Sequence, residues 1–380
     1  MFWSPVCVYA PPGLFLYVKI CIINAGWKEV TKLALDIFEF MEKASAILGT
    51  PGYEADIGAH FAGLFREYTD DIRVDALNSV IAKVGSEGPK VMISAHHDEI
   101  GMVVLAIEDD GAIRLHRNGG VDPRILPSHE VSIITRTGPV YGVVGAKPPH
   151  LLTEKDRSTA VKFDDIYVDI GYPADKVKEI VRVGDPVVML SKPVKLAGGR
   201  MAGKTLDDRA SVASMLIAME MLKKINAPAQ AYFVASSQEE VGMKGAGVAA
   251  YSIDPDFAIA VDVTHAEGPG TGKWEAFPID KMTIVTGPNL HPVLVKKAEE
   301  VADKWRIPYT REICSGVTGT DAAAIQIARG GIPTILLSVP LRYMHTSVET
   351  GVMSVIEDVG KLIALFIEEI AREWEGLKWY

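Results

Sequence analysis

The chain has 380 residues, of which 48% are hydrophobic and 23% charged, as in ordinary globular proteins, and the length suffices for two domains. Its formal net charge of −10 argues against nucleic acid as a main partner, because phosphate binding needs a basic surface. The three cysteines, Cys7, Cys21 and Cys314, form no CxxC pair, which argues against a disulfide framework or a thiolate zinc site and favours a cytoplasmic location.

The first feature along the chain is an apolar segment at residues 11–24, PPGLFLYVKICIIN. Lys19 interrupts it, no basic region precedes it, and about 18 uninterrupted apolar residues would be needed to cross a membrane. We therefore expect neither a signal peptide nor a membrane anchor, and we expect residues 1–28 to lie outside the folded domain. An amphipathic helix is predicted over 29–46 and is followed by a turn.

Helices and strands alternate over 29–100 and again over 195–380. Strands are predicted at 72–76, in SVIAKVG, in KVMISAHHDE, and at 230–237, 257–263, 308–312 and 333–339. Helices are predicted at 208–225, 243–251, 291–305, 320–329 and about 350–375. This alternation predicts an α/β domain with a mostly parallel central sheet covered by helices.

Residues 101–194 have a different pattern. Short runs of alternating polarity, such as EVSIITRT and DPVVMLSKPV, are separated by Gly, Pro, Asp and Asn, with little helical periodicity. This pattern predicts a small all-β domain, closed or sandwich-like, inserted into the α/β domain. The catalytic domain would therefore be discontinuous in sequence.

Histidine and acidic residues stand where predicted strands end or a helix begins. Ligands gather at the carboxyl ends of the strands in open α/β sheets, so these side chains are expected to converge. The candidates are His96, Asp98, Asp207, Glu239, Glu240, Asp262 and His345. Imidazole and carboxylate donors in this number suit a pair of divalent cations.

Two of these segments have competing interpretations. His96 and Asp98 are two residues apart on a strand, so both would point to one face, as a ligand histidine and the carboxylate that orients it. His97 is the rival ligand, and either histidine could instead form hydrogen bonds in the core. Asp207 and Asp208 could cap the following helix, or one could cap it while the other bridges two cations.

The Glu239–Glu240 pair is costly to place at the end of a buried strand without a compensating positive charge. It follows VASSQ and precedes the glycine-rich turn VGMKGAG. A turn lets neighbouring side chains serve separately, one as a metal ligand and one as a free general base.

Other polar positions are weaker candidates. Thr320 and Asp321 are predicted to cap a helix rather than to contact substrate. Arg342 could pair with a site carboxylate or form a structural salt bridge. His265 and His291 have no partner pattern and are interpreted as ordinary polar residues.

In chain order, AHHDEIG, LDDRAS, SSQEEVGMKGAG, IAVDVTH, GTDAAAIQIARGGIPT and RYMHTSVE closely resemble the tetrahedral aminopeptidases. These are the glutamyl or deblocking aminopeptidases of metallopeptidase clan MH. The resemblance covers about residues 30–375, including the insert, although the CSGVTGTDA segment departs from it and receives no catalytic role. It implies a metallo-aminopeptidase that removes N-terminal residues from short peptides.

The resemblance also implies a role for each site residue. Five residues would bind two divalent ions, Zn²⁺ or Co²⁺: His96, Asp207, Glu240, Asp262 and His345. Asp207 would bridge, with His96 and Asp262 on one ion and Glu240 and His345 on the other. Glu239 would be the general base, and Asp98 would hold His96 in its ligating tautomer. The peptide bond between Asp207 and Asp208, often cis in such enzymes, is predicted to be cis here.

The resemblance further implies a homo-oligomer, a tetrahedral dodecamer built from dimers that form through the β insert. Short peptides would be the substrates, and neither nucleic acid nor a membrane would be a partner. Two alternatives are a metal-dependent deacylase or carboxypeptidase on the same core, and a metal-stabilised assembly protein without turnover. A non-ligand carboxylate such as Glu239 argues against the last alternative.

Overall fold

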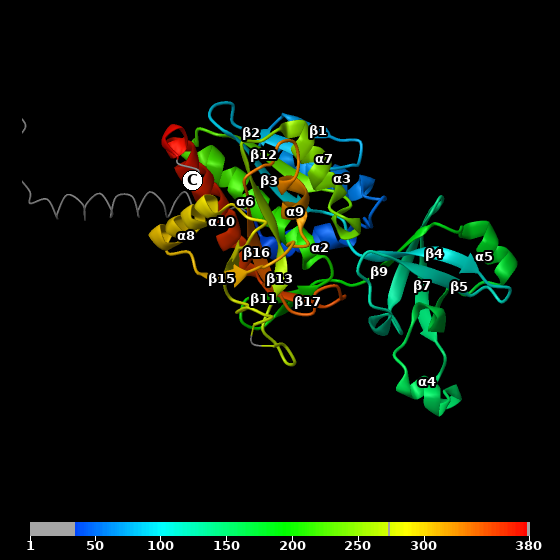
Figure 1. The fold of residues 1–380 in the computed structure, drawn as a ribbon. Helices are drawn as coiled ribbons and strands as arrows, with labels where there is room; N and C mark the ends of the chain where they lie inside the picture. Colours follow the sequence, from blue (N-terminus) through cyan, green and yellow to red (C-terminus); the bar gives the residue numbers. More distant parts are fainter. Residues whose placement is uncertain (1–34, 273, 378–380) are drawn as a thin grey trace, which may run out of the picture.

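The computed structural model describes residues 35–272 and 274–377, and the extension predicted over 1–28 lies outside this range. Figure 1 shows an α/β body from which a smaller β-barrel projects to one side. Each part has its own cluster of buried apolar side chains. In the described part of the chain, no helix combines the length and apolarity needed to cross a membrane.

The body is built on an eight-stranded sheet whose middle strands are parallel. Its order is β1 (Ile72–Val74), β2 (Val80–Val84), β12 (Gln230–Ser236), β3 (Lys90–His96), β13 (Phe257–His265), β16 (Thr334–Leu341), β14 (Met282–Thr286) and β15 (Tyr309–Ile313). Strands β12, β3, β13 and β16 run parallel, whereas β2 and β14 flank them antiparallel. The middle strands are continuous apolar runs because helices bury both faces. The predicted fold class is confirmed.

Helices cover the two faces of this sheet. On one face α6 (Leu206–Ile225) packs against α10 (Met353–Glu373), with α2 (Ile37–Ala46) and α8 (Pro292–Trp305) beside them. On the other face α7 (Lys244–Ile253) and α9 (Asp321–Gln326) pack against each other. Helix α3 (Ala55–Phe65), which the sequence pattern did not single out, lies against β1 and β2.

The projecting part is a closed barrel. Its strand order is β4 (Gly101–Ile107), β5 (Ile113–Asn118), β8 (Ile166–Asp169), β7 (Gly138–Ala146), β6 (Glu130–Thr135) and β9 (Pro186–Met189). Two short helices accompany the strands, α4 (Glu154–Ser158) and α5 (Ala174–Ile180), which the alternating pattern did not indicate. A capping box at Thr153 begins α4, and Val177 of α5 is buried with the barrel core.

A small sheet joins segments that are far apart in the sequence and lie next to the site. It consists of β10 (Val194–Leu196), β11 (Arg200–Gly203) and β17 (Glu349–Val352). Strand β11 leads directly into the start of α6, and β17 pairs with it from Gly203 to Arg200. These strands are short and were not predicted, and β10 is exposed along its length, so no apolar alternation marks it.

Candidate metal centre

The predicted site residues converge at the carboxyl end of the parallel strands. His96 ends β3, Asp262 lies in β13, and His345 follows β16. Glu240 lies in a short 3-10 turn, η4 (Glu239–Val241), directly after β12. Asp207 lies in the first turn of α6. Parallel strands end at one edge of a sheet, which brings residues from distant segments together there.

A cavity of about 530 Å³ opens at this edge. Six of the seven predicted site residues line it: His96, Asp207, Glu239, Glu240, Asp262 and His345. The seventh, Asp98, is fully buried behind His96.

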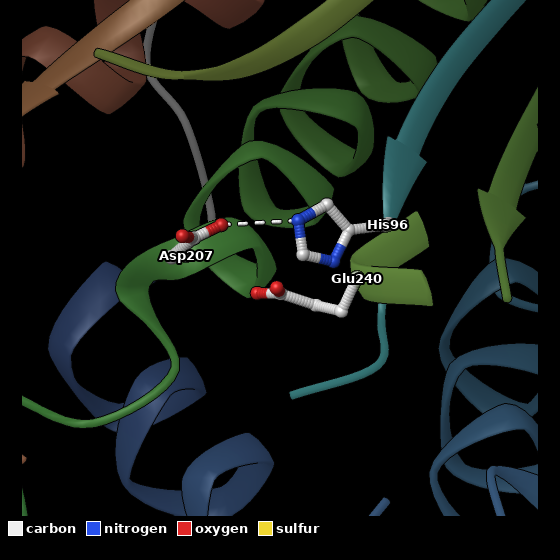
Figure 2. Close-up of side chains that lie close together, drawn as sticks. All are labelled: His96, Asp207 and Glu240. Carbon is white, nitrogen blue, oxygen red and sulfur yellow. Dashed lines mark hydrogen bonds and ion pairs between the residues drawn. The ribbon is translucent and has the colours of Figure 1, made fainter. Parts of the chain in front are cut away.

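Asp207 lies between the two histidines. Its Oδ1 is 3.0 Å from His96 Nε2, a contact that Figure 2 shows. Its Oδ2 is 3.1 Å from His345 Nε2. Glu240 Oε1 lies 3.4 Å from the same His345 nitrogen. Two donors held about 2.1 Å from one tetrahedral ion are about 3.4 Å apart, so these separations suit shared ions. One carboxylate oxygen facing each imidazole is the arrangement expected of a bridging ligand.

Asp208 adds a donor that the sequence interpretation did not include among the ligands. Its carboxylate lies within 4.8 Å of ligand atoms of His96 and Asp262. Oδ2 accepts a hydrogen bond from the backbone N–H of His96, whereas Oδ1 is buried without a hydrogen-bond partner among the described residues. The peptide bond between Asp207 and Asp208 is cis, as predicted. Thr205 precedes α6, but the backbone angles of Asp207 and Asp208 are not helical, so the regular part of the helix begins after this aspartate pair.

The carboxylates of the site are buried together, and this changes their protonation. Burial raises the pKa of Glu239 to about 10. The negative charge of Asp262 adds to this rise, and the positive charge of His96 opposes it. Burial alone would lower the pKa of His345, but hydrogen bonds to Asp207 and Glu240 raise it to about 11. In the absence of ions, protons therefore occupy ligand atoms of this site that divalent cations could bind. The donor set fits metal ions of the Zn²⁺ or Co²⁺ kind.

Asp98 connects three site residues. Its Oδ1 and Oδ2 accept hydrogen bonds from the backbone N–H groups of Glu239 and Glu240, at 3.1 and 3.2 Å. His96 Nδ1 is 3.1 Å from the carbonyl oxygen of Asp98 and 3.6 Å from its Oδ1. A partner at Nδ1 leaves Nε2, the nitrogen that faces Asp207, free to bind an ion.

Glu349 has a matching role on the other side of the cavity. Its Oε2 accepts a hydrogen bond from the backbone N–H of Asp207 at 3.1 Å, and its Oε1 accepts one from the backbone N–H of His345 at 3.0 Å. The side chain is buried and belongs to β17. The sequence analysis did not single out Glu349, although it lies in the same RYMHTSVE segment as His345. One carboxylate therefore positions two ligand segments.

The weaker candidates have other surroundings. His97 is buried and stacks on Phe61, with ring centroids 6.1 Å apart, so it does not enter the cavity. Burial lowers the pKa of His97 to about 3. Thr320 caps α9, but Asp321 is not part of that cap: its Oδ2 accepts hydrogen bonds from Ser94 and Ser236 beneath the site. Arg342 donates to the carbonyl oxygen of Glu267 and so meets neither expectation.

Comparison with known proteins relates both the sequence and the fold to peptidases. The family described as M42 glutamyl aminopeptidase matches residues 78–362. A lysyl aminopeptidase of Pyrococcus furiosus is 38% identical, over 88% of this chain and 97% of the relative. A TET aminopeptidase structure from a marine sediment Thaumarchaeota archaeon superposes with a TM-score of 0.85 at 30% identity, covering 90% of this chain and 98% of that one. The TET1 peptidase of Pyrococcus horikoshii, described as assembling into a tetrahedron or a large octahedral shell, has a TM-score of 0.79 at 31% identity, covering 88% and 100%.

Proposed function

Because the chain belongs to the M42 glutamyl aminopeptidase family, we propose that its metallo-aminopeptidase activity resides in the cavity around Asp207. The protein is a metal-dependent hydrolase of peptide bonds. One observation supports this location of the active site: the two oxygens of Asp207 face different histidines, and Glu239 lies in the same cavity. This combination supports a two-ion centre with a separate proton acceptor.

In the proposed centre, Asp207 would be shared by two ions. His96 and Asp262 would hold one ion, with Asp208 as a further neighbouring donor, and Glu240 and His345 would hold the other. Two divalent ions, when bound, would polarise the scissile carbonyl, lower the pKa of a water molecule and attract the free α-amino group. Asp98 and Glu349 keep the ligand segments in register through the backbone hydrogen bonds that they accept.

Glu239 is proposed as the general base. Its Oε2 is 4.0 Å from His96 Nε2, farther than the Asp207 oxygen on the same nitrogen, which supports a position beside the ligands rather than among them. Its carboxylate accepts the proton of the attacking water and returns it to the amine that leaves. Burial favours the proton-bound form of this group in the metal-free protein, and the positive charge of bound ions would lower its pKa so that the carboxylate could accept a proton.

The position of the cleaved bond distinguishes this function from deacylation or carboxypeptidase activity on the same core. We expect hydrolysis of aminoacyl chromogenic amides with a free amino terminus, and at least about a hundredfold lower kcat/KM for the N-acetylated substrates. Substrates cleaved only from their carboxyl ends, or N-acetylated substrates cleaved as well as free ones, would instead support the alternatives. The few cysteines favour the cytoplasm as the place of action.

Assembly into a homo-oligomer through the barrel is part of the proposal. Strand β7 exposes Tyr141 and Val143, and Leu105 on β4 is half exposed, so the barrel presents apolar side chains outward. Relatives described as a dodecamer and as a tetrahedron or large octahedral shell support a tetrahedral dodecamer, which we propose to be built from dimers. Native mass spectrometry is expected to give twelve times the subunit mass, and replacing Tyr141 and Val143 by Asp is expected to lower it. A monomeric wild-type protein would contradict this assembly.

A further inference from the structure

We propose that Glu312 makes this cavity select peptides whose N-terminal residue has a positively charged side chain, lysine or arginine. The inference rests on the aminopeptidase function proposed above and specifies its substrate class.

Glu312 lies in β15 and shares a face of the sheet with Asp262. Asp262 on β13 pairs with Ser338 on β16, Ser338 pairs with Thr283 on β14, and Thr283 pairs with Thr310 on β15. Residues paired in this way point to one face, and Glu312, two residues after Thr310, points with them. The metal-binding face of the sheet therefore continues to Glu312, which lines the same cavity.

Two threonines fix the carboxylate. Thr264 Oγ1 donates to Oε1 at 3.1 Å, and Thr283 Oγ1 donates to Oε2 at 2.7 Å. A carboxylate has about four acceptor positions, so each oxygen keeps capacity for one more donor. Burial raises the pKa of Glu312, and the two hydroxyl groups oppose that rise, as a bound ammonium group also would.

In the part of the chain that the structure describes, the cavity wall offers Glu312 no Lys or Arg as a partner, and the ionisable neighbour whose positive form interacts with its charge is His265. Among the described residues that line it there are five carboxylates and no Lys or Arg. Four of the five, Asp207, Glu239, Glu240 and Asp262, belong to the proposed metal centre, where bound ions would compensate them. Glu312 lies outside that group, and His265 is the other titratable side chain of the wall that the centre does not use.

The charge balance favours a cationic substrate side chain. An apolar side chain would leave Glu312 partly buried with only the ionisable His265 to balance its charge, and an acidic one would place two negative charges together. A lysine or arginine side chain would supply the missing charge and hydrogen-bond donors. The expectation is opposite to the glutamyl preference in the name of the family and is in line with the name of the lysyl aminopeptidase of Pyrococcus furiosus.

The spacing also suits a long side chain. Thr264, which contacts Glu312, is two residues beyond Asp262 on β13, or about 7 Å along the strand. The four-carbon stem of lysine carries its ammonium group about 6 Å from its Cα. A peptide with its first carbonyl at the metal centre can therefore reach Glu312 with its first side chain.

The test compares lysyl, leucyl and glutamyl chromogenic amides on the metal-loaded enzyme. Wild type is expected to give the highest kcat/KM with the lysyl amide and the lowest with the glutamyl amide. In Glu312→Gln, which keeps the shape and removes the charge, the lysyl-to-leucyl ratio of kcat/KM is expected to fall at least about tenfold. Free lysine is also expected to lose its advantage over free leucine as a competitive inhibitor of this variant.

A matched control is Glu299→Gln. Glu299 pairs with Arg311 on β15 and does not line the cavity, so removing its charge should leave the lysyl-to-leucyl ratio within about twofold. An equal fall with all three substrates in Glu312→Gln would show a role at the α-amino group or in folding and would overturn the selectivity proposal. A wild type that prefers the glutamyl amide would overturn it too. Absence of hydrolysis with every amide would instead refute the proposed function on which the inference rests.

Discussion

Glu239→Gln is expected to lower kcat about 10³-fold or more with little change in KM. The amide has the shape of the carboxylate but cannot accept a proton from water, and general base catalysis by a positioned group contributes roughly 10²–10⁴-fold. Because the same carboxylate returns the proton to the leaving amine, the loss should fall in the upper part of that range. Activity near that of wild type would remove Glu239 as the base.

Glu240→Gln is the informative partner to that variant. Glu240 lies one residue further along the same turn but faces His345, where we propose that it binds an ion. Glu239→Gln should keep its bound metal and should not recover with added metal. Glu240→Gln should lose metal on dialysis and recover part of its activity when excess Zn²⁺ or Co²⁺ is supplied. If both variants kept their metal equally well, the assigned division between base and ligand would be wrong.

Removal of the metal is expected to abolish peptide hydrolysis and to destabilise the protein more at pH 9 than at pH 6.5. The site holds several buried carboxylates, and without divalent ions only protons compensate them. Metal-chelated and reloaded samples should be compared by activity and by urea unfolding at the two pH values. Zn²⁺ and Co²⁺ should restore activity, whereas Ca²⁺, which prefers six to eight oxygen ligands, should not.

The sign of this pH dependence comes from the raised pKa values. The pKa of Glu239 is raised from 4.5 to about 10 and that of His345 from 6.5 to about 11, so between pH 6.5 and 10 the folded metal-free protein binds more protons than the unfolded chain. Its free energy of unfolding must therefore fall as the pH rises through this window. The lowered pKa of Asp207 acts in the opposite direction, but its contribution is already complete at any pH well above the ordinary aspartate pKa of 3.8. Bound ions hold these carboxylates charged and these imidazoles neutral, so the metal-loaded protein should lose less stability over the same range. Stability that rises with pH after chelation would contradict the charge balance derived for the site.

Local patterns predicted the elements that bury continuous apolar runs. Strands β3, β12, β13 and β16 and helices α6 and α10 all lie within or close to their predicted ranges. The strand β14 was missed, although Met282–Val285 is buried, because the five-residue run MTIVT is short and lies between loops. Strands β10, β11 and β17 have no such signal. Strands β10 and β11 form a short hairpin, and β17 pairs with β11 across about 150 residues of sequence.

By itself, the sequence determined the fold class and the kinds of residue at the strand ends, because burial of parallel strands requires apolar runs and ligands gather where these runs stop. Only the tertiary structure decided which carboxylate faces which histidine. The position of Asp207 between His96 and His345 depends on the order of β3 and β16 in the sheet and on the start of α6. The same holds for Glu349, which positions two ligand segments, and for Glu312, which reaches the cavity from β15 at the edge of the sheet. Strand order and register arise from contacts between distant segments, and no local periodicity encodes them.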